Sequence, residues 1–135
     1  MTSIERPASP RHTRQRAEIR QAVEEQEGFA TAQEIHDRMR HDGSGVGLAT
    51  VYRTLQGLAA TGEVDAIRTP DGQVAYRTCS PGHHHHLICR SCGRTVEVSI
   101  PSLEAQVRAL AAEQGFAEVE HALEFYGTCT ECARA

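Results

Sequence analysis

The chain has 135 residues, of which 39% are hydrophobic and 24% are charged, a composition typical of a globular protein rather than a disordered one. Its net charge of −4 disfavours a nucleic-acid surface spread over the whole molecule, and no apolar run approaches the roughly 20 residues that span a bilayer. The first residues lack a signal peptide's apolar segment, so we expect a cytoplasmic protein whose five cysteines are thiols or metal ligands.

Positive charge gathers at the start of the chain. All 14 basic residues are arginines, and five of them fall within the first 20 positions: Arg6, Arg11, Arg14, Arg16 and Arg20. The planar guanidinium binds phosphate through two hydrogen bonds at once. The cluster indicates a basic arm for nucleic acid, although a solvated tail would have the same composition.

The first half predicts three helices. After a proline-rich start, residues 12–27 form the first, with Ile19 and Val23 directed inward. Thr31 is an N-cap and Glu34 completes a capping box, which opens a second helix with Ala32, Ile35 and Met39 on its apolar face. A third helix covers residues 48–61 and ends at Gly62; its buried stripe consists of Leu48, Val51, Leu55, Leu58 and Ala59.

A hairpin follows the third helix. Two short strands contain Ile67, Val74 and Tyr76, and the turn between them is Pro70-Asp71-Gly72. Helices followed by a hairpin predict a winged helix whose third helix enters the major groove of DNA. The outer face of that helix would present Thr50 or Thr54, with Tyr52, Arg53 and Gln56, to the bases, although an ordinary solvated face fits the spacing equally well.

The second half predicts an α+β domain with a small antiparallel sheet. The expected elements are strands over 86–89 and 95–99, a helix over 101–114 and a last strand over 116–128. In the helix Leu103, Val107 and Leu110 are apolar, and in the last strand Val119, His121, Leu123 and Phe125 alternate with Glu118, Glu120 and Glu124.

Two C-x-x-C pairs flank this half, Cys89 with Cys92 and Cys129 with Cys132. In a cytosolic protein they predict a closed, tetrahedral, structural zinc site, brought together by the strand–helix–strand segment between them. A redox C-x-x-C is the weaker interpretation, because no thioredoxin-like unit surrounds either pair.

Four consecutive histidines, His83 to His86, precede the first pair. In an extended segment His83 and His85 point to one side and His84 and His86 to the other, so one run supplies ligand pairs to two separate metal sites. Its place in the middle of the chain argues against a purification tag.

Each histidine pair needs further ligands. Cys79 and Asp65 are the candidates on one side, and Glu104 and His121 on the other. Asp65 as a surface acid, Glu104 as a partner of Arg108 and His121 as a core histidine are the simpler alternatives.

Three segments together resemble the ferric uptake regulator family: LATVYRTL (48–55), HHHHLICRSCG (83–93) and CTEC (129–132). The resemblance covers about Thr13 to Cys132 and is closest to the zinc-sensing branch of actinobacterial type. It implies a winged-helix DNA-binding domain (1–80), a hinge and metal-binding segment (81–86) and a dimerisation domain (87–135). It also implies a homodimer that represses zinc uptake genes by binding palindromic operators when loaded with metal.

The resemblance further implies three metal sites. The structural zinc is assigned to Cys89, Cys92, Cys129 and Cys132, a regulatory hinge site to Asp65, Cys79, His84 and His86, and a third site to His83, His85, Glu104 and His121. DNA contacts are expected from Arg14, Arg16, Thr50, Tyr52, Arg53 and Gln56.

Zinc, at two to three ions per chain, is the expected cofactor, because the thiolate of Cys79 favours it over manganese. Ligand chemistry alone leaves nickel and cobalt open. An iron-, manganese- or peroxide-responsive regulator of the same family is the alternative, and a zinc buffer remains a rival class. We expect no enzyme, because a zinc hydrolase needs an open coordination position and a nearby base.

Overall fold

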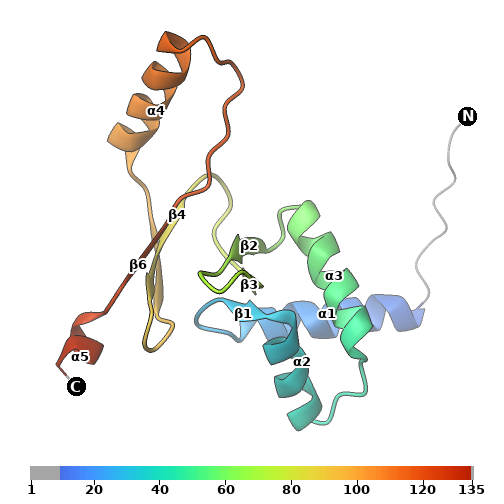
Figure 1. Cartoon of the computed structure of the whole chain (residues 1–135). Coiled ribbons are helices and arrows are strands. Elements are labelled where there is room, and N and C mark those ends of the chain that lie inside the picture. Colours follow the sequence, from blue (N-terminus) through green and yellow to red (C-terminus); the bar gives the residue numbers. More distant parts are fainter. Residues whose placement is uncertain (1–9, 135) are drawn as a thin grey trace, which may run out of the picture. The chain divides into compact units, whose positions relative to one another are not determined.

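The computed structural model describes residues 10–134, and residues 1–9 and 135 lie outside the described part (Figure 1). The expected proline-rich start, and Arg6 within the basic arm, therefore fall outside the described residues. The chain divides into two compact units, Met1–Cys79 and Ser80–Ala135, called here the first unit and the second unit. None of the described helices has the length and apolar character that a membrane crossing requires.

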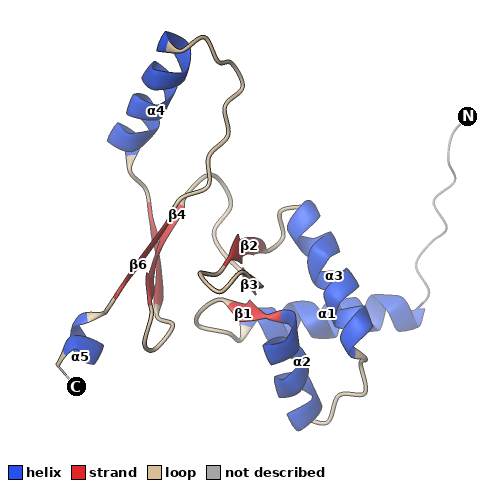
Figure 2. Cartoon of the chain, in the orientation of Figure 1, coloured by secondary structure: helices blue, strands red, loops and turns tan. Residues whose placement is uncertain are grey.

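Between residues 10 and 79 the first unit contains three helices, α1 (Pro10–Glu24), α2 (Ala32–His41) and α3 (Leu48–Ala60) (Figure 2). Helix α1 starts at Pro10, where the missing N–H of proline costs no helical hydrogen bond. The three helices pack around one apolar core, which includes Ile19, Val23, Ala32, Ile35, Met39, Val51, Leu55 and Leu58. The predicted inward faces of the first two helices are confirmed.

Helix α2 begins with the predicted capping box. The backbone N–H of Glu34 donates to the Thr31 hydroxyl (3.2 Å), and the backbone N–H of Thr31 donates to the Glu34 carboxylate (3.1 Å). Both N–H groups would otherwise lack a helical partner, and such a cap stabilises a helix by about 1 kcal/mol.

Helix α3 buries a narrower stripe than predicted. Val51, Leu55 and Leu58 are fully buried, whereas Leu48 and Ala59 are only half-buried at the ends of the stripe. Gly62 follows with a φ of +78°, a left-handed conformation that ends the helix and that a side chain would strain.

A three-stranded antiparallel sheet completes the first unit, with β1 (Ala30–Thr31), β2 (Asp65–Arg68) and β3 (Val74–Arg77) in the order β1-β3-β2. The predicted hairpin is β2–β3, and its turn uses Gly72 at a φ of +87°. Strand β1 was not predicted, because two residues are too short to show an alternating pattern. The helices and hairpin form the predicted winged-helix arrangement.

The second unit contains β4 (His85–Cys89), β5 (Thr95–Val98), α4 (Pro101–Glu113), β6 (Glu124–Gly127) and the short α5 (Thr130–Ala133). Its sheet has the order β5-β4-β6. The predicted antiparallel pairing is confirmed for β4 and β5, whereas β6 runs parallel to β4. The α4 connection returns the chain to the end where β4 starts, as a parallel pair requires.

The last strand is shorter than predicted. Residues 116–123 form no strand, and Glu118 has a φ of +55°. Alternating polarity produces a strand only beside another strand, and the β4–β6 register starts at His86 opposite Glu124. Apolar side chains here and on α4 stay exposed within the chain: Leu110, Phe116, Val119 and Leu123.

Candidate metal centres and nucleic-acid surface

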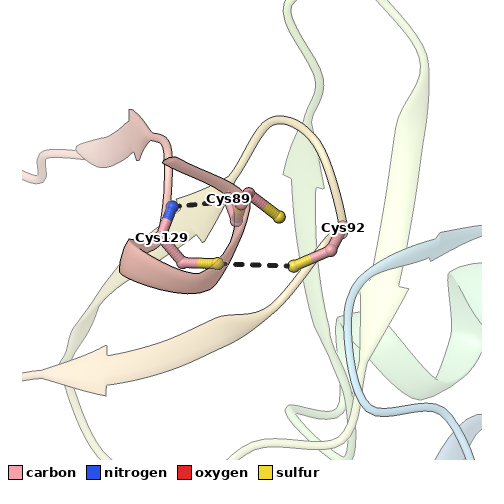
Figure 3. A group of neighbouring side chains, drawn as sticks. Cys89, Cys92 and Cys129 are labelled. Carbon is pink, nitrogen blue, oxygen red and sulfur yellow. Dashed lines mark hydrogen bonds between the residues drawn. The ribbon is translucent and has the colours of Figure 1, made fainter. Parts of the chain in front are cut away.

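The four cysteines of the two C-x-x-C pairs converge at one end of the second sheet. Cys89 ends β4 and Cys92 lies in the β4–β5 turn, while Cys129 is the N-cap of α5 and Cys132 lies within that helix. Their four sulfur atoms all lie within 4.8 Å of one another. Figure 3 shows three of them, with the Cys92 and Cys129 sulfurs 3.8 Å apart and the Cys129 N–H donating to the Cys89 sulfur (3.3 Å).

This arrangement fits tetrahedral zinc. A zinc–sulfur bond of about 2.3 Å gives a sulfur–sulfur separation of about 3.8 Å around a tetrahedron. Backbone N–H groups of Cys129 and Cys92 lower the pKa of Cys89 to about 6. Side-chain hydrogen bonds to Cys129 and Cys92 raise the pKa of Cys132 to about 12, so Cys132 must release a proton when it binds a cation.

A second group of possible metal ligands lies at the opposite end of β4. The ligand atoms of His83, His85, Glu104 and His121 lie within 4.8 Å of one another. The Nε2 atom of His83 is 3.0 Å from a Glu104 oxygen and 3.1 Å from the Nε2 atom of His121, which is itself 3.1 Å from Glu104. Tetrahedral zinc with nitrogen and oxygen ligands needs separations of about 3.3 Å, so this donor set also fits.

The buried His85 anchors this cluster. Its Nδ1–H donates to the carbonyl of Leu123 (3.0 Å), and its Nε2 contacts Glu104 at 2.7 Å. The Glu104 contact raises the pKa of His85, and the same contact is the main reason that the pKa of Glu104 falls to about 2. The His85 and Glu104 atoms that a cation would bind thus face each other directly.

Two residues of the predicted hinge site lie together in the first unit. Asp65 begins β2, Cys79 follows β3, and the carboxylate and the sulfur are within 4.8 Å of each other. Burial is the main cause that raises the pKa of the Cys79 thiol to about 12; Asp65 raises it further, while Arg77, 3.2 Å from the sulfur, opposes the rise.

The other two residues of the predicted hinge site lie together in the second unit. The rings of His84 and His86 meet edge to face with centroids 4.8 Å apart, and those of His83 and His85 do the same at 4.9 Å. The predicted alternation of the histidine run is therefore confirmed.

Backbone and carboxylate acceptors fix the ring orientation of three successive histidines. Nδ1 of His84 lies 2.9 Å from the carbonyl of Gly82, Nδ1 of His85 lies 3.0 Å from that of Leu123, and Nδ1 of His86 lies 2.6 Å from Glu124. Each acceptor accepts a hydrogen bond from Nδ1–H, which leaves the lone pair of Nε2 available to bind a metal ion. The sequence did not predict the acceptors at Leu123 and Glu124, because they depend on the β4–β6 register.

The predicted DNA-facing residues of α3 are outward. Tyr52 is 44% exposed, Arg53 and Gln56 are exposed, and Thr50 is half-buried. A cleft of about 560 Å³ lies between α1 and α3, lined among others by Arg11, Arg16, Thr50 and Arg53. Arg11 was not among the predicted contacts, although it belongs to the basic cluster.

The two predicted arginines of α1 differ in environment. Arg14 is exposed, whereas Arg16 forms an ion pair with Glu63 at 2.5 Å. Glu63 also binds Arg20 (3.0 Å) and accepts a hydrogen bond from Thr61, and that hydrogen bond is the main reason that the pKa of Glu63 falls. A DNA phosphate would therefore have to share Arg16 with a carboxylate.

Comparison with known proteins identifies relatives for nearly the whole chain. The sequence profile of the ferric uptake regulator family matches residues 8–126. The zinc uptake regulation protein of Mycobacterium tuberculosis is 49% identical over 125 residues, which cover 93% of this chain and 96% of that protein.

Solved structures agree with this match. The crystal structure of FurB from M. tuberculosis, a zinc uptake regulator, superposes with a TM-score of 0.56 at 49% identity, covering 93% of this chain and 97% of that chain. A zinc uptake regulator complexed with zinc and DNA gives a TM-score of 0.75 at 28% identity, covering 93% and 83% of the two chains.

Proposed function

Because the chain belongs to the ferric uptake regulator family, we propose that it is a zinc-responsive transcriptional repressor that binds palindromic operators as a zinc-loaded homodimer and represses genes of zinc uptake and homeostasis. The observation that carries the proposal is the donor set available around the hinge. Asp65 and Cys79 belong to the first unit, and His84 and His86 to the second. One carboxylate, one thiolate and two imidazoles suit tetrahedral zinc better than manganese.

We assign three metal sites to each chain. The structural site is Cys89, Cys92, Cys129 and Cys132, the hinge site is Asp65, Cys79, His84 and His86, and the third site is His83, His85, Glu104 and His121. The donor sets and the separations measured within each unit support the assignment. A bound zinc ion supplies fixed coordination geometry and no redox chemistry.

The proposed mechanism is a clamp at the hinge. Only residues 80–83 separate Cys79 from His84, and each neighbouring unit contributes two ligands. When all four side chains share one cation, Asp65 and Cys79 are held to His84 and His86, and the hinge between them is ordered. An ordered hinge fixes the two recognition helices of a dimer at the spacing of successive major grooves.

The domain roles follow from this mechanism. The DNA-binding domain is residues 1–80, the hinge and metal-binding segment is residues 81–86, and the dimerisation domain is residues 87–135. The exposed apolar side chains of α4 and residues 116–123 support a dimer, because a second copy would cover them. Arg14, Arg16, Thr50, Tyr52, Arg53 and Gln56 contact DNA, and their position on α1 and α3 supports this role.

We further infer that the protein acts in the cytoplasm, where its operators lie, and that it is not an enzyme. Each assigned site offers four protein ligands, which leaves no open coordination position for a substrate. A peroxide sensor that uses Cys79 is disfavoured, because the thiolate is the reactive form and the pKa of this thiol is raised to about 12.

A selection of genomic DNA fragments tests the proposal. The full-length protein is incubated with sheared DNA in parallel buffers that contain zinc, iron(II), manganese or a chelator, at one salt concentration, because salt alone changes protein–DNA affinity strongly. We expect enrichment of a palindrome in zinc only. Enrichment in iron or manganese would move the protein to another branch of the family, and no enrichment in any metal would refute a regulatory role.

A further inference from the structure

Glu124 belongs to none of the three assigned ligand sets, yet it contacts a hinge ligand directly. Its Oε2 atom lies 2.6 Å from Nδ1 of His86. A carboxylate oxygen accepts hydrogen bonds, so in this pair the proton resides on Nδ1 of His86. The lone pair of the neutral ring is then on Nε2, which is the nitrogen available to a metal ion.

The sheet itself produces this contact. His86 and Glu124 are register partners in the parallel pairing of β4 and β6, and β6 begins at Glu124. One residue earlier, the Leu123 carbonyl accepts from His85, whose side chain points to the opposite side of β4. The start of β6 therefore sets the ring orientation of two adjacent histidines that serve two different sites.

Glu124 and the hinge cation would lie on opposite edges of the His86 ring, because Nδ1 and Nε2 point away from each other. The carboxylate is therefore not a fifth ligand of that ion. We propose that Glu124 is a positioning residue, which holds His86 in the Nδ1–H tautomer with Nε2 directed to the hinge site. This inference rests on the proposed function, which assigns His86 to that site.

Such partners strengthen metal binding by restricting the ring and by making the ligand nitrogen more basic, and their loss typically weakens affinity about 10–100-fold. An alternative role for Glu124 is to pair with a buried histidine and contribute only to folding. The two roles differ in the tautomer that they predict for the His86 ring and in the metal affinity that they predict for the hinge site.

The first test reads the tautomer in the full-length protein, with the four-cysteine site loaded and the other metals removed. Nitrogen-15 shifts of the His86 ring are recorded at about pH 8, above the ordinary histidine pKa of about 6.5. The wild type should show Nδ1–H. Glu124→Ala should shift the ring toward Nε2–H, and Glu124→Gln, whose amide oxygen still accepts, should retain Nδ1–H. A wild-type ring in the Nε2–H form would overturn the proposal without any variant.

The second test measures the hinge site with cobalt(II). With the four-cysteine site already loaded, the hinge site and the third site remain empty, and only the hinge site contains a thiolate. A sulfur-to-cobalt charge-transfer band therefore reports on the hinge site alone. Competition with zinc then gives the zinc affinity of that site. Glu124→Ala should weaken that affinity about 10–100-fold, Glu124→Gln less than tenfold, and the exposed control Glu120→Ala not at all.

The outcomes separate this inference from the function on which it rests. A wild-type protein without the charge-transfer band would refute the hinge site itself. A normal band with unchanged affinity in Glu124→Ala would refute the positioning role alone. Neither measurement involves DNA, so the results for the tautomer and for the hinge affinity do not depend on the outcome of the operator selection.

Discussion

Arg16 of α1 and Glu63, which follows α3, form an ion pair of 2.5 Å that ties the first helix of the winged-helix unit to the end of its third. The same carboxylate binds Arg20 at 3.0 Å. Two arginines of the basic cluster, one of them an expected DNA contact, are thus engaged by an acid of their own chain.

Replacing Glu63 with glutamine should therefore increase DNA affinity. The change releases Arg16 and Arg20 and removes a negative charge near the backbone of DNA. If both arginines reach phosphates, the slope of log affinity against log salt should steepen by about 1.8, at about 0.9 per phosphate contact. Fluorescence anisotropy over a series of salt concentrations measures the affinity and this slope. Glu27→Gln, an equal change of charge at an exposed site, is the control; an unchanged slope in Glu63→Gln would mean that neither arginine gains a phosphate contact.

Cys79→Ala should abolish zinc-dependent operator binding and leave the protein folded and dimeric. Removing the thiolate leaves three ligands at the hinge, while the other two clusters keep all of theirs. Gel-shift titration in buffered zinc measures the response, and analytical ultracentrifugation checks the dimer. A normal zinc response in this variant would refute the clamp.

Cys92→Ala should have a different effect and disrupt the second unit. Three sulfurs would remain where the four now lie within 4.8 Å, and structural zinc contributes directly to folding free energy. We expect one zinc fewer per chain by elemental analysis and loss of the dimer by ultracentrifugation. The structural assignment fails if the variant stays dimeric with an unaltered melting temperature.

Zinc affinity at the hinge should fall as the pH falls. Because the pKa of Cys79 is raised to about 12, the metal-free thiol is protonated at neutral pH, and binding must release that proton. This single proton predicts about a tenfold loss of affinity per pH unit, with a steeper loss below about pH 6.5 as histidines gain protons. Cobalt titrations between about pH 6 and 8 measure it, with Cys79→Ala as the control; a flat profile would contradict the assignment of Cys79 as ligand.

The sequence predicts local features of this fold well. The Thr31–Glu34 capping box depends only on residues three apart, and the two faces of the histidine run follow from the geometry of any extended chain. Both signals are contained in a few neighbouring residues, which explains why the structure agrees with them.

The sequence did not predict features that depend on segments far apart in the chain. The strand predicted over 116–128 is confined to Glu124–Gly127, because strand formation depends on what lies beside the segment and not on its own alternation. The role of Glu124 next to His86 was equally hidden, since the sequence does not reveal that β6 joins β4 in parallel and in this register.

The parallel placement of β6 has a consequence for how the second unit folds. Cys89 and Cys92 are separated from Cys129 and Cys132 by β5, α4, residues 116–123 and β6. The first pair therefore cannot complete its coordination until all of these have been synthesised and have folded back. Joining the two pairs closes a long loop, and closing a loop of this span costs about 4 kcal/mol of chain entropy. Because the unfolded chain offers no preformed site, the free energy of zinc binding stabilises the folded sheet directly. Newly made protein that lacks zinc should expose two thiol pairs to competing metals and oxidants.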